Sequence, residues 1–167
     1  MNNETKPQVE FEHEDFDFET IEDELKVDER CQALLYSFFQ DLQARGATPE
    51  QASDLSYSAD FYLRDYLLDF CRLNVVTPQP GLIRKFAATW YIKTTLDPEM
   101  AVLERHLAAI RELYRFMHRQ NFISREELLF LEVETENLEF YRQRIESFNA
   151  LAGDGYEAWE AQCPLKD

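Results

Sequence analysis

Arginine is the residue type whose spacing in this 167-residue chain most clearly suggests a chemical role. Arg111, Arg115 and Arg119 recur at four-residue intervals, so a helix would align them along one face. A row of guanidinium groups of this kind can bind the phosphates of a nucleic acid. The candidate contacts with nucleic acid or with a partner are the six basic residues Arg84, Lys85, Arg105, Arg111, Arg115 and Arg119.

The same arginines have a second interpretation, as ion-pair formers within the protein. Arginines one helical turn apart repel each other slightly unless anions face them. Glu112 is placed to pair with Arg115, and glutamates are frequent after residue 125. We favour this second interpretation, in which the arginines lie on a solvated face and pair with the acidic C-terminal helix.

The charge of the chain is unevenly distributed along the sequence. The net charge is −16, from 33 acidic and 17 basic residues, and this argues against non-specific binding to nucleic acid. Residues 1–30 contain 12 acidic and 3 basic side chains, whereas residues 64–125 contain 6 acidic and 10 basic ones. The centre of the chain is therefore basic, and the acidic ends could mask it.

Residues that could support catalysis or hold a metal are not arranged for either task. The four glycines, at positions 46, 81, 153 and 155, form no phosphate-binding loop, and no G-x-S-x-G sequence is present. Among the histidines, only His13 has the Glu-x-x-His spacing of a di-iron site, with Glu10, which we interpret as chance. His106 and His118 are expected on the outer, solvated face of a helix. We predict no catalytic, cofactor-binding or metal-binding residue, and no enzyme.

The cysteines and the hydropathy pattern suggest a cellular compartment. Cys31, Cys71 and Cys163 are an odd and widely spaced set, which indicates a reduced, cytoplasmic protein. Cys71 is predicted to be a small core residue rather than a nucleophile. No apolar run approaches the roughly 20 residues that a membrane-spanning helix needs. The N-terminus lacks the basic and apolar regions of a secretory signal.

The elements that must position these residues are helices. Apolar residues recur at three- and four-residue steps in five segments, which predicts an all-α fold, a compact bundle of about five helices. The expected helices cover about residues 28–45, 48–73 and 81–93, then one from 98 toward 124 and one from 124 to 150. Thr48 and Ser124 are predicted caps. The most regular apolar seam consists of Met100, Leu103, Leu107, Ile110, Tyr114 and Met117.

The domain organisation is predicted to be one helical domain with an acidic extension. Aromatic and apolar residues alternate with acidic ones over Val9–Phe18, but no other stretch offers a strand partner. We therefore expect residues 1–27 to form a flexible acidic tail and residues 28–167 to form a single helical domain. Tyr156 and Trp159 are expected to fold back onto the bundle.

Two segments resemble the N-terminal core-binding (SAM-like) domain of tyrosine recombinases, the phage-integrase type. The segment 57–70, YSADFYLRDYLLDF, is similar to the first helix of that domain. Its last main helix is matched by the residues Leu107, Ala109, Ile110, Arg111, Leu113, Tyr114, Phe116 and Met117. The resemblance covers about residues 52–125 and implies a small four-helix module that binds duplex DNA through basic helical faces. The catalytic domain of that family is absent, so no catalytic residue is implied.

Two hypotheses of function remain open from the sequence. In the first, which we favour, the chain is a non-catalytic interaction or regulatory protein whose acidic, aromatic-rich ends contact a protein partner. In the second, it is a DNA-associated module whose basic face is covered by the acidic termini. No cofactor and no membrane contact are expected under either hypothesis. A leftover apolar face on the fifth helix would permit a homodimer.

Overall fold

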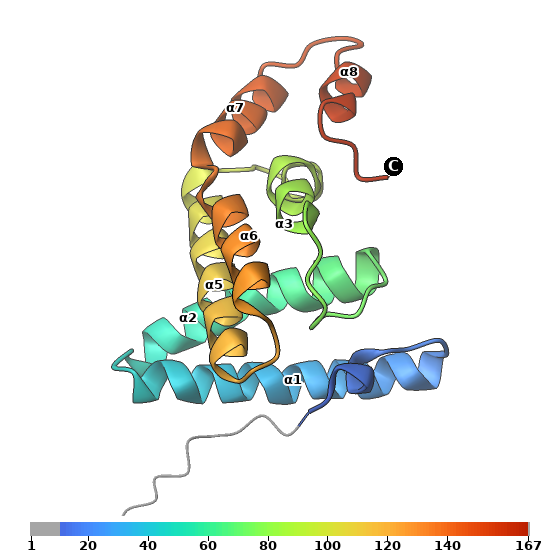
Figure 1. Cartoon of the computed structure of the whole chain (residues 1–167). Coiled ribbons are helices and arrows are strands. Elements are labelled where there is room, and N and C mark those ends of the chain that lie inside the picture. Colours follow the sequence, from blue (N-terminus) through green and yellow to red (C-terminus); the bar gives the residue numbers. More distant parts are fainter. Residues whose placement is uncertain (1–10, 167) are drawn as a thin grey trace, which may run out of the picture.

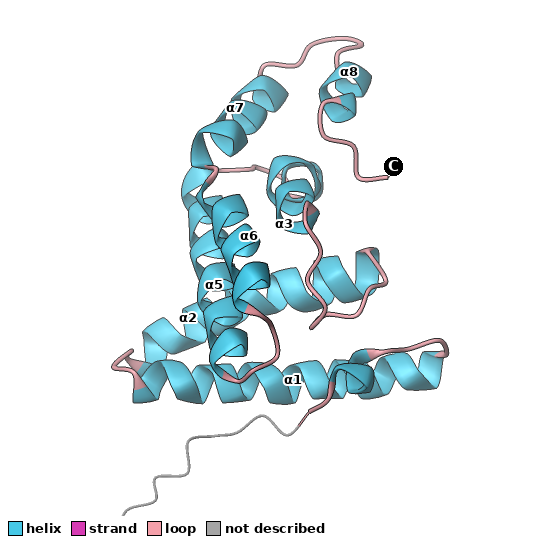
Figure 2. Ribbon diagram, viewed as in Figure 1, coloured by secondary structure: helices cyan, strands magenta, loops and turns pink. Residues whose placement is uncertain are grey.

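The computed structural model describes residues 11–166, and within them every regular element is a helix (Figure 2). The predicted all-α class is therefore confirmed. The longer α-helices are α1 (Ile21–Ala44), α2 (Pro49–Asp60), α5 (Met100–Arg119), α6 (Arg125–Glu136), α7 (Leu138–Asn149) and α8 (Tyr156–Ala161). The other elements are the 3₁₀-helix η1 (His13–Phe16), the π-helices η2 (Phe61–Phe70) and η3 (Phe86–Trp90), and the short α-helices α3 (Leu82–Lys85) and α4 (Tyr91–Thr94).

The helices form two groups that cross each other (Figure 1). Helix α1 lies along the base of the molecule, and α2 with its extension η2 runs antiparallel to it. Helices α5 and α6 form an upright antiparallel pair, and α5 packs on α2. Helices α7 and α8 lie at the end of the molecule remote from α1. This arrangement gives α5 neighbours on several sides, in keeping with its regular apolar seam.

The first long helix begins seven residues earlier than the predicted start at residue 28. Thr20 caps α1, because its Oγ1 accepts a hydrogen bond from the Asp23 amide at 3.1 Å. The Asp23 carboxylate accepts the Thr20 amide in return at 3.3 Å, which completes a capping box. Val27 on the second turn is fully buried. The predicted start at residue 28 was wrong because the acidic segment before it was interpreted as a flexible tail, although it contains the Thr20 cap and the buried Val27.

Residues 11–20 pack on the bundle, although the sequence suggested a flexible tail. Phe16, on the 3₁₀-helix η1, is fully buried and meets Phe122 edge to face at 6.3 Å between ring centroids. His13 stacks on Phe122 at 5.8 Å, and its Nε2 donates a hydrogen bond to the Phe122 carbonyl at 2.6 Å. The remainder of the expected tail, residues 1–10 with Val9 and Glu10, lies outside the described residues.

Two of the predicted helices contain segments of π-helix. The expected helix 48–73 is α2 followed without interruption by η2, whose end is marked by a Cys71 amide that donates to the Tyr66 carbonyl, five residues back, at 2.8 Å. The expected helix 81–93 is α3, η3 and α4 in succession, and the Tyr91 amide donates to the Phe86 carbonyl. Residues in a π-helix can have the same apolar composition as those in an α-helix, so the sequence did not show which parts of these helices would be π-helical.

The two π segments meet in a cluster of aromatic rings centred on Phe86. The fully buried Phe86 ring lies between 5.0 and 6.5 Å, by ring centroid, from six others: Phe61, Tyr62, Tyr66, Trp90, Tyr91 and His106. Aromatic pairs at such distances stabilise a core beyond the area that they bury. The cluster therefore joins η2, η3 and α5.

His106 belongs to this cluster, which corrects its predicted place on the outer face of a helix. Its ring lies 5.1 Å from Phe61 and 5.7 Å from Tyr91, and its Nδ1 is buried without a hydrogen-bond partner. Burial, and to a smaller extent the charge of Arg105, lowers the pKa of the imidazole below its usual value. His106 is therefore neutral near pH 7.

The predicted fifth helix is divided in two at Asn137. Helix α6 ends at Glu136, and α7 begins at Leu138 after a residue with φ −78° and ψ 49°. The Tyr141 hydroxyl donates a hydrogen bond to the Glu134 carbonyl at 2.5 Å. This side chain takes the place of the backbone amide that would bond to the same carbonyl in a continuous helix. The break lets α6 pack on α5 while α7 packs on η3.

The C-terminal segment is held by a buried arginine that the sequence analysis did not single out. Arg144 donates from Nε to the Ala88 carbonyl at 2.9 Å, from Nη1 to the Trp159 carbonyl at 2.6 Å and from Nη2 to Thr89 Oγ1 at 3.0 Å. Its guanidinium lies 3.9 Å from the centroid of the Trp159 ring. Trp159 is buried, so the predicted return of this residue to the bundle is confirmed.

Candidate functional site

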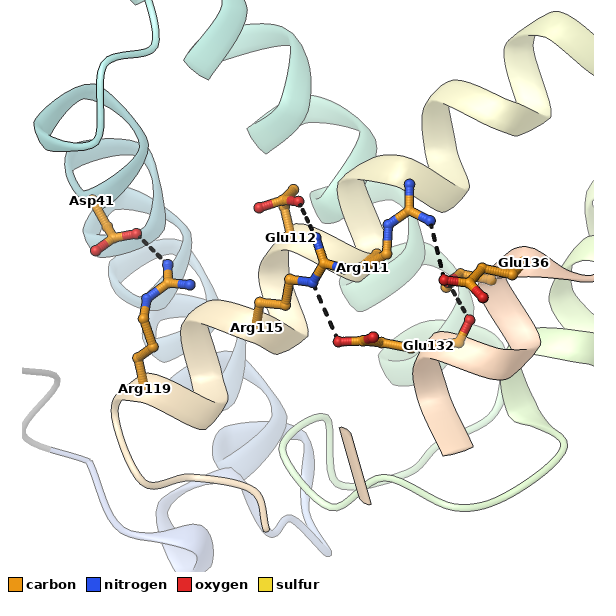
Figure 3. A network of polar contacts seen from close by, with 8 residues as sticks. Asp41, Arg111, Glu112, Arg115, Arg119, Glu132 and Glu136 are labelled. Carbon is orange, nitrogen blue, oxygen red and sulfur yellow. Dashed lines mark hydrogen bonds and ion pairs between the residues drawn. The ribbon is translucent and has the colours of Figure 1, made fainter. Parts of the chain in front are cut away.

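The predicted arginine row exists as one line along α5, and each of its three guanidinium groups faces carboxylates (Figure 3). Arg115 pairs with Glu132 on α6 at 3.2 Å and with Glu112 at 3.0 Å. Arg111 lies 3.9 Å from Glu136, also on α6. The expected pairing of the row with the acidic helix after residue 125 is confirmed for these two arginines.

Arg119, the last member of the row, pairs with a different element. Its Nη2 lies 2.7 Å from Asp41 Oδ2 on α1 (Figure 3). The row therefore links α5 to α6 at one end and to α1 at the other. Each partly exposed pair contributes little to stability, on the order of 0–1 kcal/mol. Their larger effect is on ligand binding. The carboxylates neutralise the guanidinium charges of the row, which a phosphate group would otherwise bind.

The other three basic candidates do not extend this row. The Arg84 guanidinium lies over the Phe140 ring at 4.9 Å, and the Arg84 amide donates to the Glu134 carboxylate at 3.0 Å. Lys85 follows on the same short helix and is half-buried. Arg105 is exposed on the side of α5 that faces α2. The structure thus keeps Arg111, Arg115 and Arg119 together and places the other three predicted residues apart from them.

These ion pairs lead to a test of the DNA hypothesis. We expect fluorescence anisotropy of labelled duplex DNA to show no saturable binding by the full chain at about 0.15 M salt, because the row is compensated and the chain carries a net charge of −16. A matched variant with Asp41, Glu112, Glu132 and Glu136 replaced by their amides frees the row. Binding by the unaltered chain that Arg111→Gln, Arg115→Gln and Arg119→Gln together abolish would show that the interpretation as internal ion pairs is wrong.

A second candidate site lies along one face of α1, where apolar side chains are exposed. Ile21 is 78% exposed, Leu25 63% and Tyr36 62%. Two hollows follow this face, one of about 280 Å³ near Ile21 and Leu25 and one of about 350 Å³ near Tyr36. Their other walls come from α2 and η2, including Ser53, Ser56, Asp60, Leu68 and Asp69. We call these two hollows and the α1 residues between them the α1 face.

The α1 face is negatively charged as well as apolar. Glu24, Asp28 and Asp69 line the first hollow. Burial, together with Glu24 and Asp28, raises the pKa of Asp69, and burial with Asp60 and Asp69 raises that of its neighbour Asp65. The four carboxylates Glu24, Asp28, Asp60 and Asp69 outnumber the nearby Arg64 and Arg72, so the face carries a net negative charge.

Sequence reasoning missed the α1 face for an identifiable reason. Ile21, Leu25, Asp28, Gln32, Tyr36 and Phe39 recur at helical spacing, so they form one stripe along α1. The expected helix began at residue 28, which left Ile21 and Leu25 outside it. A helix assigned from the capping box at Thr20 would have placed Ile21 and Leu25 on the same face as Tyr36 and Phe39, with the polar Asp28 and Gln32 between them.

Other kinds of site find no support in the part of the chain that the structure describes. No group of three or more His, Cys, Asp or Glu residues there could hold a metal ion. Among the same residues, no helix is long and apolar enough to cross a bilayer. Comparison with known proteins found no match: no family model, no curated protein and no solved structure resembles the chain significantly.

Proposed function

We propose that the protein is a non-catalytic interaction protein that binds a basic, amphipathic helix of a partner along the α1 face. The observation that carries this proposal is the stripe of exposed apolar residues on α1, with Ile21, Leu25 and Tyr36 lining two hollows. Exposed apolar side chains beside hollows along a helix–helix seam are the kind of surface that helix-in-groove recognition uses.

Charge complementarity identifies the kind of partner. Asp69 lines the first hollow, and Asp65 lies four residues before it on η2. Neither has an ion-pair partner among the described residues, and other carboxylates surround them, so a cation placed near them would be stabilised. A helix with lysines or arginines beside an apolar stripe matches both properties of the α1 face. A second copy of this chain would bring the same carboxylates together, so we do not place a homodimer there.

The remaining sequence hypotheses stay proposals of lower rank. Leu129 and Val133 on α6 are exposed, at 53% and 67%, and supply the apolar face on which a homodimer was expected. The resemblance to core-binding domains stays a prediction, and the ion pairs of the arginine row favour the protein partner over DNA. The three thiols are free, in keeping with the proposed cytoplasmic location.

The proposal is tested by titrating the full chain with a labelled Leu/Lys amphipathic peptide of about 18 residues, the length of the α1 stripe. We expect saturable binding that weakens with salt, because surface charge pairs are screened. The variant Leu25→Ser should weaken binding about tenfold, since a leucine loses its burial. The matched control Leu129→Ser removes another exposed leucine, 53% against 63% for Leu25, on α6 and should leave binding unchanged.

The dependence on pH supplies a second readout. A bound cation favours the charged form of Asp65 and Asp69, whose pKa values are raised in the free protein. Affinity should therefore fall as the pH is lowered through those raised values, which lie above 3.8, and Asp69→Asn should weaken this dependence. A peptide of the same composition with scrambled periodicity that binds equally well, or equal losses in Leu25→Ser and Leu129→Ser, would refute the proposal.

A further inference from the structure

A cavity of about 380 Å³ lies between α2 and α5, apart from the α1 face hollow that contains Asp69. Its walls are helical on both sides, and Leu55, Val102 and Ala108 supply its apolar lining. Rigid helices that pack on each other hold such a space open without a ligand. The volume is in the range of small-molecule sites, roughly 300–1,000 Å³.

The polar lining of this cavity is concentrated on a few side chains. Ser58 and Asp54 come from α2, and Arg105 and His106 come from α5. Within the described residues, no carboxylate lies at ion-pair distance from Arg105. The Arg105 guanidinium is therefore available to an anion in the cavity, whereas the arginine row on the same helix is paired with carboxylates.

His106 adds a second group that lacks a partner. Its ring is held by Phe61 and Tyr91, and its buried Nδ1 makes no hydrogen bond. The imidazole lines the cavity beside Arg105, and the positive charge of that arginine opposes its protonation. An anion in the cavity would compensate Arg105 and would make the protonated imidazole more favourable.

We propose that this cavity binds a small molecule made of an apolar body and one carboxylate group. The carboxylate lies against the Arg105 guanidinium and the Ser58 hydroxyl, and the apolar body lies against Leu55, Val102 and Ala108. A carboxylate fits the planar fork of a guanidinium, and the binding is a charge-assisted hydrogen bond. Asp54, at the same cavity, opposes any anion and limits the ligand to a single negative charge.

The test compares three probes that share one apolar chain: hexanoate, 1-hexanol and hexylammonium. Each is titrated into the full-length protein, and binding is followed by amide ¹H–¹⁵N chemical shifts. We expect hexanoate to bind at least about tenfold more tightly than the other two, with shifts concentrated at Ser58, Arg105 and Ala108. The pKa of His106, followed from its ring protons, should rise when hexanoate is bound.

Variants show whether Arg105 recognises the carboxylate or whether the cavity binds any apolar molecule. Arg105→Gln should weaken hexanoate about tenfold, and Asp54→Asn should strengthen it. The matched control Arg125→Gln, an exposed arginine on α6, should change neither. Equal binding of 1-hexanol, tighter binding of hexylammonium, an unchanged affinity in Arg105→Gln, or no shifts at these amides with any probe would each overturn the proposal. Tyr57 lines both this cavity and the α1-face hollow near Tyr36, but none of these variants alters it, so the two proposals are tested separately.

Discussion

Replacing Arg144 by alanine is expected to lower the free energy of unfolding by about 3 kcal/mol. Arg144 is 2% exposed, and it donates hydrogen bonds to the Ala88 and Trp159 carbonyls and to the Thr89 hydroxyl, all of which alanine would remove from a buried site. The Trp159 ring would also lose the guanidinium that lies over it. Because no carboxylate faces Arg144 among the described residues, the loss comes from hydrogen bonding and packing rather than from an ion pair.

The measurement is urea unfolding followed by circular dichroism, with the linear dependence on denaturant giving the free energy. Arg142→Ala is the matched control, because Arg142 lies on the same helix with its side chain about half exposed and pairs only with Glu104 and Glu139. We expect that variant to cost less than about 0.5 kcal/mol. Equal effects of the two substitutions would contradict the role assigned to Arg144.

Phe86→Ala is expected to destabilise the protein by about 3–5 kcal/mol. Phe86 is fully buried at the centre of the aromatic cluster, so its removal leaves a cavity that the rings of η2 and α5 cannot easily fill. Phe70→Ala is the comparison, since Phe70 belongs to η2 and contacts Trp90 but is 43% exposed. We expect a loss of about 1 kcal/mol there.

Thermal and urea unfolding of both variants would decide whether the two π segments form the centre of the core. A small effect of Phe86→Ala, within experimental error of Phe70→Ala, would mean that the contacts between η2 and η3 contribute little. A large effect with an unchanged slope against denaturant would show that stability alone has changed.

The parts of the fold that followed from periodicity were predictable from the sequence, and those that depended on tertiary contacts were not. The seam of α5 and the caps at Thr48 and Ser124 are local patterns, and the structure confirms them. The break at Asn137 depends on a hydroxyl from Tyr141, which no local pattern indicates. The π segments likewise arise from packing rather than from composition.

In the candidate sites, too, local patterns were predictable and contacts between distant residues were not. The row of Arg111, Arg115 and Arg119 could be read from spacing, and the Arg115 pair with Glu112 was predictable because it is three residues away. The Arg119 pair with Asp41 spans 78 residues and needed the fold. The α1 face was missed through a boundary error at Ile21, and Arg144 was missed because a buried arginine has no sequence signature.

The contact between η1 and the turn after α5 bears on the order in which the chain folds. His13 and Phe122 are 109 residues apart in sequence, so their contact closes a loop nearly as long as the domain. Closing such a loop costs conformational entropy that is recovered only when the turn bearing Phe122 is already in place. We therefore expect the N-terminal segment to dock after the bundle has formed and to join α1 to the antiparallel pair of α5 and α6 in a late step of folding.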